Sequence, residues 1–277
     1  MKDSREELRD RVIHGLSALP EVRGLYLSGR EVYGQPDEYS DVDLICCSCD
    51  PARTQGAYRS ILNDISPIRG SFLMMEKPDI LVEMLILADH SPYQKLDFSI
   101  VPNLEKQEFL APFKTVYESG DPAPEHPSEM AISGRALDLQ NRMNDILFSI
   151  PRFTKCLFRG DFDMYRRWEG IVASLCVLLH ERHFGWQKDP RPRLNPFEYK
   201  VMYKALNDGE RRRLEEIQPL SGRPDIATGF QKSLGLFIDL YREKAKHLDA
   251  RLDDAFVDYM RGFADSEIRR FLHRAPA

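Results

Sequence analysis

Residues 25–47 read LYLSGREVYGQPDEYSDVDLICC, and the pair Asp41-Val42-Asp43 is the most informative feature of this stretch. Two carboxylates separated by one residue on a strand point to the same face, so they can share a divalent metal ion. The apolar residues before Ser28 and after Asp41 predict two strands. Gly-Gln-Pro-Asp at residues 34–37 is typical of a turn between them. The stretch therefore predicts a strand–turn–strand unit that carries a candidate metal site.

The first of these strands, residues 22–27, ends at Ser28-Gly29-Arg30. Backbone N–H groups at such a turn can hold the phosphates of a nucleoside triphosphate, above all where a helix begins there. Ser28, Gly29 and Arg30 are therefore candidate nucleotide-binding residues.

The Asp-x-Asp pattern by itself is weak, because roughly two matches are expected by chance in a chain of this composition. The second match, Asp161-Phe162-Asp163, precedes a helical pattern and is interpreted as a helix N-cap with acidic support in the first turn. Asp41 and Asp43 differ from that match in two ways: they follow a predicted strand and turn, and a third carboxylate, Asp97, lies in another predicted strand.

Asp97 lies in the second of two apolar runs, residues 80–87 and 95–101, which predict antiparallel strands joined by a polar turn. Leu96, Phe98 and Ile100 alternate with Asp97 and Ser99. Asp97 is therefore expected to point away from the apolar face of its strand.

These residues resemble the DNA polymerase β-like nucleotidyltransferase superfamily, whose pattern is Gly-Ser, a short spacer, Asp-x-Asp and a later acidic residue on a neighbouring strand. Residues 29–44 are similar to the lincosamide nucleotidyltransferases, and residues 95–102, KLDFSIVP, to the aminoglycoside 6-adenylyltransferases. The resemblance covers about the first 120 residues by motif and the remainder by helical character only. The chain departs from the pattern at Arg30, where the family has Ser.

The resemblance implies an α+β fold: a nucleotidyltransferase domain over residues 1–120, with a mixed sheet flanked by helices, then a helical bundle over residues 131–277 that binds the acceptor. It implies an Mg²⁺-dependent transferase that moves an NMP group, with ATP the first choice of donor, to a hydroxyl of a small molecule. The expected acceptor is an aminoglycoside or lincosamide antibiotic, which would make the chain an antibiotic-resistance enzyme. Related enzymes include monomers and homodimers.

Asp41 and Asp43 would bridge the metal ions, as hard cations require carboxylate oxygens. Asp97 would either bind metal or accept the proton of the acceptor hydroxyl. Glu83 is the alternative base, although pairing with a basic neighbour or exposure to solvent also explains it.

Lys155 and Arg159 lie four residues apart, so they share a helix face and could reach the triphosphate. The alternative is that both are surface charges paired with acids such as Asp161 or Asp163.

Turn-forming residues at 119–128 predict a linker, and the chain changes character there. Before it, helices are expected at residues 4–18 and 53–65 together with the motif strands. After it, helical spacing of apolar residues predicts helices at 132–150, 151–158, 161–184, 196–206 and 210–217 and a long pair over 225–273.

The net charge of −5 and a pI near 5.9 argue against a nucleic-acid backbone as the main ligand. A charged N-terminus and the lack of a bilayer-length apolar run predict a cytoplasmic protein. The five cysteines suit reduced thiols, and the C-x-x-C spacing of Cys46 and Cys49 is interpreted as packing.

Two alternatives share the predicted fold: a nucleotidyltransferase acting on protein or RNA, as in toxin–antitoxin systems, and a catalytically silent nucleotide-binding protein. The P-loop pattern of other nucleotide enzymes is missing from the sequence. The residues leave open the acceptor, the preferred NTP and the oligomeric state.

Overall fold

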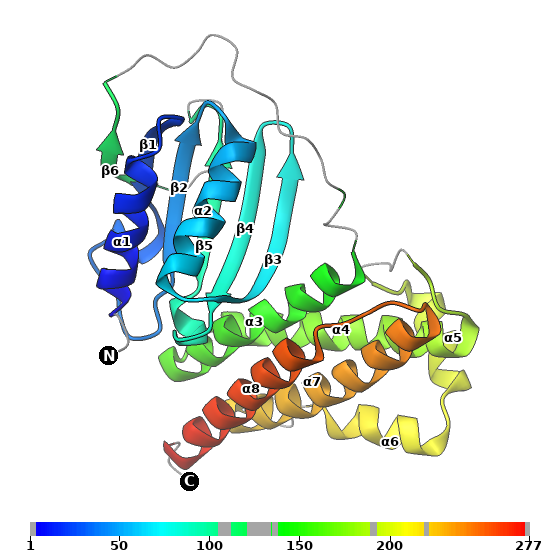
Figure 1. The fold of residues 1–277 in the computed structure, drawn as a ribbon. Helices are drawn as coiled ribbons and strands as arrows, with labels where there is room; N and C mark the ends of the chain where they lie inside the picture. Colours follow the sequence, from blue (N-terminus) through cyan, green and yellow to red (C-terminus); the bar gives the residue numbers. More distant parts are fainter. Residues whose placement is uncertain are drawn as a thin grey trace. The chain divides into compact units, whose positions relative to one another are not determined.

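The computed structural model describes residues 4–104, 112–120, 134, 138–188, 193–218 and 222–274 (Figure 1). The chain divides into two compact units, Met1–Asn141 and Arg142–Ala277. The first unit contains a mixed sheet covered by helices, and the described part of the second contains helices only. This confirms the predicted α+β class. The predicted linker at 119–128 lies outside the described residues from position 121 on.

The sheet of the first unit has six strands in the order β3-β4-β5-β2-β1-β6. Its strands are β1 (Val22–Leu27), β2 (Val42–Ser48), β3 (Ile68–Lys77), β4 (Ile80–Leu87), β5 (Leu96–Val101) and β6 (Lys114–Glu118). Only the central pair, β2 and β5, runs parallel, and every other neighbouring pair is antiparallel. The four strands that the sequence predicts are confirmed, whereas β3 and β6 were not predicted.

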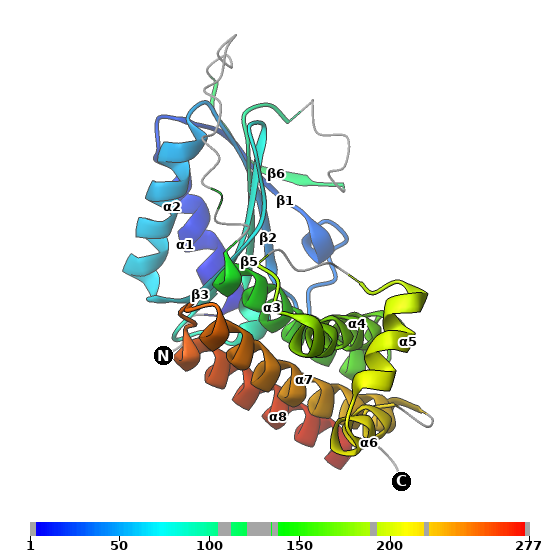
Figure 2. The same cartoon turned by 90° about the vertical axis from the view of Figure 1, so that its right-hand side faces the viewer.

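Two helices, α1 (Arg5–Ser17) and α2 (Pro51–Ile65), cover one face of this sheet, as Figure 2 shows. Ser4 caps α1 through a capping box with Glu7, and Asp50 caps α2 by accepting the N–H of Arg53. Both helices confirm the sequence prediction to within two residues.

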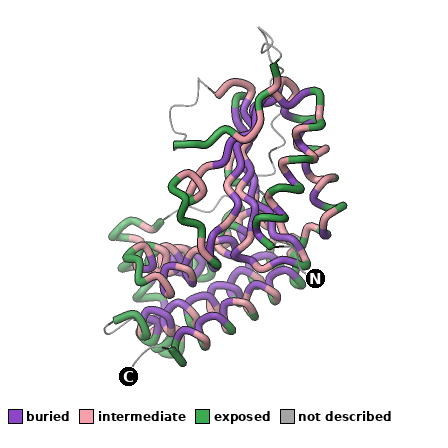
Figure 3. Tube along the Cα trace, turned by 90° about the vertical axis from the view of Figure 1, so that its left-hand side faces the viewer, coloured by how far each residue is buried: buried purple, intermediate pink, exposed green. Residues whose placement is uncertain are grey.

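The main core of this unit lies between the helices and the covered face of the sheet. Apolar side chains of α1 and α2 pack there on alternate residues of the strands, and the buried positions follow the central strands in Figure 3. Tyr58 of α2 stacks on Phe98 of β5, with 3.7 Å between ring centroids. The alternate residues that face away, Asp43 and Asp97 among them, lie on the face that α1 and α2 leave uncovered.

The second unit is built from α3 (Leu139–Arg159), which begins at the end of the first unit, α4 (Asp163–Phe184), α5 (Pro196–Ala205), α6 (Asp208–Glu216), α7 (Gly222–His247) and α8 (Asp254–Arg274). The last four confirm the predicted helices with shifts of a few residues at their ends. Buried aromatic rings pack between helices of this unit. Phe153 of α3, for example, stacks on Phe230 of α7 with 3.6 Å between ring centroids.

The predicted break between two helices at Pro151 is wrong, because α3 continues through it. Proline cannot donate to the carbonyl four residues earlier, a loss worth about 3 kcal/mol in a helix interior. Ile150 and Phe153 on either side are fully buried, so packing offsets this cost. Part of the predicted range before it, residues 132–133 and 135–137, lies outside the described residues.

The Asp-x-Asp match at the start of α4 provides the predicted acidic first turn, but the predicted side-chain N-cap is wrong, because the N-cap residue is Phe162 and makes no side-chain cap hydrogen bond. Asp161 accepts a hydrogen bond from the N–H of Asp163 at 3.0 Å, and Asp163 provides the acidic first turn and pairs with Arg167 at 2.6 Å. Among the helices that the structure describes, none combines the length and apolar composition needed to cross a bilayer.

Replacing Tyr58 by Phe tests the core on the covered face of β5, the strand that carries Asp97 on its other face. The Tyr58 hydroxyl is fully buried and has no hydrogen-bond partner among the described residues. Burial raises the pKa of Tyr58, as do the nearby charges of Glu83 and Asp97, so the hydroxyl stays protonated. We expect Tyr58→Phe to leave the free energy of unfolding unchanged or to raise it by up to about 1 kcal/mol, measured by urea denaturation. Tyr199→Phe is the control and should be destabilised, because it loses a hydrogen bond to Cys176. A loss of stability in Tyr58→Phe larger than that in Tyr199→Phe would show that the Tyr58 hydroxyl does have a hydrogen-bond partner.

Candidate active site

Asp43 and Asp97 lie side by side because β2 and β5 pair in parallel with these two residues in register. Their neighbours on either side, Val42 and Leu44 in β2 and Leu96 and Phe98 in β5, belong to the core under α1 and α2. Alternation therefore turns both carboxylates to the other face. The orientation predicted for Asp97 is confirmed.

Asp41 immediately precedes β2 and is held by a turn. Within that turn, the Asp37 carboxylate accepts hydrogen bonds from the N–H of Tyr39 and the hydroxyl of Ser40. The Asp41 carbonyl accepts two hydrogen bonds from the guanidinium of Arg5, at 3.0 and 3.1 Å. Backbone and side-chain contacts thus fix the residue that opens the strand.

The three carboxylates converge, since one oxygen from each of Asp41, Asp43 and Asp97 lies within 4.8 Å of the others. All three residues are half-buried. Carboxylate oxygens at this spacing are the donors that a hard divalent cation such as Mg²⁺ requires, so the set fits the metal implied by the sequence.

The turn after β1 packs directly on this cluster. A short 3₁₀ helix, η1 (Gly29–Glu31), begins after Ser28, whose N–H donates to the Asp43 carbonyl at 3.1 Å. Gly29 has φ = +64°, and a Cβ placed there would lie 2.2 Å from Oδ2 of Asp43. Only glycine therefore lets the backbone approach the carboxylate so closely.

Arg30, the departure from the family pattern, points along the same loop. Its guanidinium lies 3.5 Å from both the Gln35 carbonyl and the Asp37 carboxylate, and the side chain is 46% exposed. Contacts at this distance are weak, so they leave the side chain able to rearrange toward a ligand.

Lys95 belongs to the cluster, and sequence reasoning missed it. It precedes Asp97 by two residues and so points to the same face, and its side chain is 1% exposed. Its ammonium contacts the carboxylates of Asp41, at 2.7 Å, and of Asp97. The i, i+2 spacing of Lys95 and Asp97 was the available signal.

Glu83 does not join the cluster. It is the cross-strand partner of Phe98 in the β4–β5 pair, so it lies on the face covered by α2. There it is fully buried and forms an ion pair with Arg59. Pairing with a basic neighbour is confirmed, and the alternative of Glu83 as the base is wrong because it faces away from Asp97.

Lys155 and Arg159 lie on α3, half-buried, in the second unit. Their predicted contact with the triphosphate stays a prediction. Asp163, one of the acids considered as their partner, instead pairs with Arg167 of its own helix.

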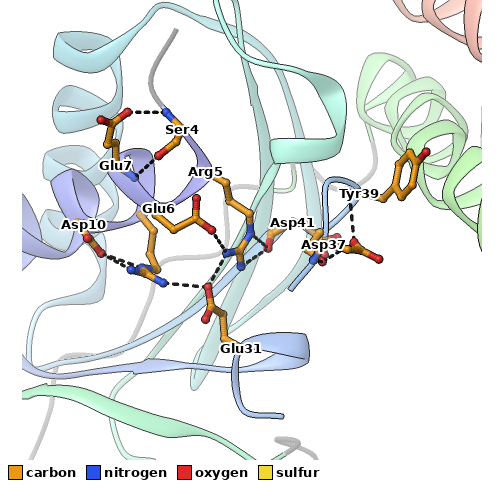
Figure 4. Close-up of polar contacts among 11 residues, drawn as sticks. Ser4, Arg5, Glu6, Glu7, Asp10, Glu31, Asp37, Tyr39 and Asp41 are labelled. Atoms are coloured by element: carbon orange, nitrogen blue, oxygen red, sulfur yellow. Dashed lines mark hydrogen bonds and ion pairs between the residues drawn. The ribbon is translucent and has the colours of Figure 1, made fainter. Parts of the chain in front are cut away.

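A second set of charges ties α1 to the turn that contains η1 (Figure 4). Glu31 of η1 accepts hydrogen bonds from Arg5 and Arg9, and Arg5 also holds Asp41. Burial alone would raise the pKa of Glu31, but the hydrogen bonds and charges of the two arginines outweigh it and lower the pKa. Arg5 thus connects η1 to the strand that carries Asp43.

No protein-family model and no curated protein sequence matches the chain. Solved structures that align with it include an aminoglycoside 6-adenyltransferase from Bacillus subtilis, 13% identical, covering 96% of this chain and 98% of that one with a TM-score of 0.36. A putative nucleotidyltransferase from Helicobacter pylori is 13% identical over 99% and 97% of the two chains, with a TM-score of 0.25. JHP933 from the same organism is 16% identical over 98% and 93%, with a TM-score of 0.26. These scores are too low to assign a family, so the function must come from the chain's own residues.

Replacing Gly29 by Ala tests the contact between the turn and Asp43. We expect both a loss of stability of at least about 1 kcal/mol, from a non-glycine residue at positive φ, and a displaced Asp43 carboxylate. Gly34→Ala is the matched control, because Gly34 has φ = +63° but open space around its Cβ. Urea denaturation and Mn²⁺ titration should show that both variants lose stability and only Gly29→Ala loses metal affinity. Equal metal affinity in the two variants would contradict the assignment.

Replacing Glu31 by Gln tests the ion network through its pH dependence. A carboxyl whose pKa is lowered in the folded state contributes stability above its ordinary value of 4.5, and that contribution is lost as the pH falls through the lowered value. We expect Glu31→Gln to cost about 1.5–3 kcal/mol at neutral pH and less on acidification below 4.5, measured by urea denaturation. Glu6, which meets Arg5 at the exposed surface, provides the control, and Glu6→Gln should cost little. If the difference in unfolding free energy between the wild type and Glu31→Gln grew on acidification, the ion pairs of Glu31 with Arg5 and Arg9 would not stabilise the fold as described.

Proposed function

We propose that this chain is an Mg²⁺-dependent nucleotidyltransferase that moves an NMP group from a nucleoside triphosphate, ATP first, to a hydroxyl of a small polar molecule. The observation that supports it best is the convergence of Asp41, Asp43 and Asp97 beside a glycine turn whose backbone touches Asp43. The motif resemblance to antibiotic nucleotidyltransferases favours an aminoglycoside or lincosamide acceptor and a role in antibiotic resistance.

In this proposal, Asp41 and Asp43 hold the metal and Asp97 faces the acceptor. Bound Mg²⁺ would supply positive charge to the phosphate oxygens on which negative charge develops. The acceptor oxygen attacks the α-phosphorus, the bond from that phosphorus to the β-phosphate oxygen breaks, and pyrophosphate leaves. Asp97 takes the hydroxyl proton, for which its position beside Asp43 on the next strand is suited.

The phosphates would bind at the turn after β1. The backbone N–H groups of Gly29 and Arg30, together with the hydroxyl of Ser28, can donate to phosphate oxygens at the start of η1, while the Ser28 N–H holds the Asp43 carbonyl. Arg30 can give up its weak contacts with the loop to bind the β- and γ-phosphates with its guanidinium fork.

A screen of ATP, GTP, CTP and UTP against aminoglycosides and lincosamides with Mg²⁺ tests the proposal. We expect pyrophosphate release and an acceptor whose mass has increased by one NMP group. Transfer to a protein or RNA, but to no small molecule, would support the macromolecular alternative. No product with any pair of donor and acceptor would contradict transferase activity.

Removing single carboxylates should separate their roles. Asp41→Asn or Asp43→Asn should keep the fold and lower the turnover rate to less than about a tenth, because the metal loses a ligand. Asp97→Asn should retain nucleotide affinity while the chemical step slows by about 10²–10⁴-fold.

The control for these carboxylate variants is Asp161→Asn, from the Asp-x-Asp match at the start of α4, which should retain activity. Single-turnover kinetics and calorimetric nucleotide titration provide the measurements. A loss of nucleotide affinity without a slower step would make Asp97 a metal ligand instead of the base.

A further inference from the structure

Lys95 is a buried cation placed on two acids of the candidate site: Asp41, which the proposed function assigns to the metal ion, and Asp97, which it assigns to the proton of the acceptor. The residue follows the short helix η2 (Pro92–Gln94), and its carbonyl accepts the N–H of Val42 at 3.0 Å, where β2 and β5 begin to pair. Its side chain is buried, yet both acids that it contacts, Asp41 and Asp97, are 15% exposed. Solvent and ions therefore reach the carboxylates, whereas the ammonium approaches them from within the protein.

A comparison with Lys244, the other fully buried lysine among the described residues, shows what is unusual here. Lys244 of α7 forms a one-to-one pair with Glu181 of α4 at 2.7 Å, and both partners are buried. Such a pair neutralises itself inside the protein and needs no further ion. Lys95 instead divides one positive charge between two carboxylates of a cluster of three, so it offsets only one of the three negative charges.

An ammonium and a divalent cation cannot use the same carboxylate oxygens without cost. Both draw on the negative charge of the Asp41 carboxylate, and two positive charges a few ångströms apart repel each other by several kcal/mol even at an effective dielectric constant near 20. The contacts of Lys95 with Asp41 and Asp97 therefore lower the affinity of the cluster for a metal ion.

We propose that Lys95 is an internal competing cation, which keeps divalent-metal affinity low in the free protein so that the metal binds productively only together with the nucleoside triphosphate. The phosphates bring additional oxygen ligands and negative charge, which compensate for the charge of Lys95. This inference rests on the proposed function for the nucleotide step, but the competition between Lys95 and the metal does not depend on catalysis.

Titration with Mn²⁺ alone, followed by electron paramagnetic resonance, tests the competition. We expect Lys95→Met to bind Mn²⁺ at least about tenfold more tightly than the wild type, because a nearby positive charge has been removed. The double variant Lys95→Met/Asp43→Asn should lose this gain if the ion binds at the carboxylates. Affinity in Lys95→Met that equals or falls below that of the wild type would overturn the proposal.

Two controls separate the competition from a merely structural role. Lys244→Met removes an equally buried lysine and should leave Mn²⁺ affinity unchanged. Lys95→Met should unfold at a lower temperature than the wild type and regain stability on addition of Mn²⁺, whereas Lys244→Met should be stabilised by Mn²⁺ no more than the wild type is. A Lys95→Met protein that is destabilised and insensitive to Mn²⁺ would assign Lys95 to the fold alone.

The wild type provides a measurement that is independent of any folding defect. Its Mn²⁺ affinity should rise at least about tenfold when a non-transferable α,β-methylene analogue of ATP is present, because the phosphates add charge and ligands. Equal affinity with and without the analogue would overturn ordered binding. If the transferase screen fails while Lys95→Met gains Mn²⁺ affinity, the competition stands and the proposed function falls. If transfer is observed while Lys95→Met gains no Mn²⁺ affinity, the proposed function stands and the competition falls.

Discussion

The parallel pairing of β2 and β5 is the constraint on which the candidate site depends. It is the only parallel pair in the described sheet, and its register places Asp43 directly beside Asp97. Because side chains alternate along both strands, the same register that buries Leu44 and Phe98 under the helices turns the two acids to the opposite face. A shift by one residue would place the carboxylates in the core, so packing and chemistry specify the same register.

Charges around this pair are held by buried partners instead of by flexible surface contacts. Arg5 fixes the Asp41 carbonyl and Glu31, Lys95 joins Asp41 to Asp97, and Gly29 brings the turn against Asp43. Each of these contacts limits how far an acid can move, which is the preorganisation that a metal or phosphate site requires. Glu83, which is fully buried, is compensated by Arg59 on the other face and has no such role.

Much of this arrangement follows from local sequence. Asp-x-Asp on a strand, the alternation around Asp97 and the turn at Gly29 predicted the position and direction of the acids, because strand period and turn chemistry are local properties. The position of Lys95 against both acids and the salt bridges of Arg5 depend on which strands and helices become neighbours. The sequence alone does not define those neighbours. Strands β3 and β6 were missed, and the break expected at Pro151 was wrong because tertiary packing overrides local propensity.

The most direct test of the central claim is anomalous diffraction from crystals soaked with Mn²⁺ and a non-transferable nucleotide analogue. The account predicts an anomalous peak coordinated by the carboxylates of Asp41 and Asp43, with the phosphates at the turn formed by Ser28, Gly29 and Arg30. A nucleotide bound elsewhere, or an ordered nucleotide at this turn with no metal peak at the carboxylates, would contradict it.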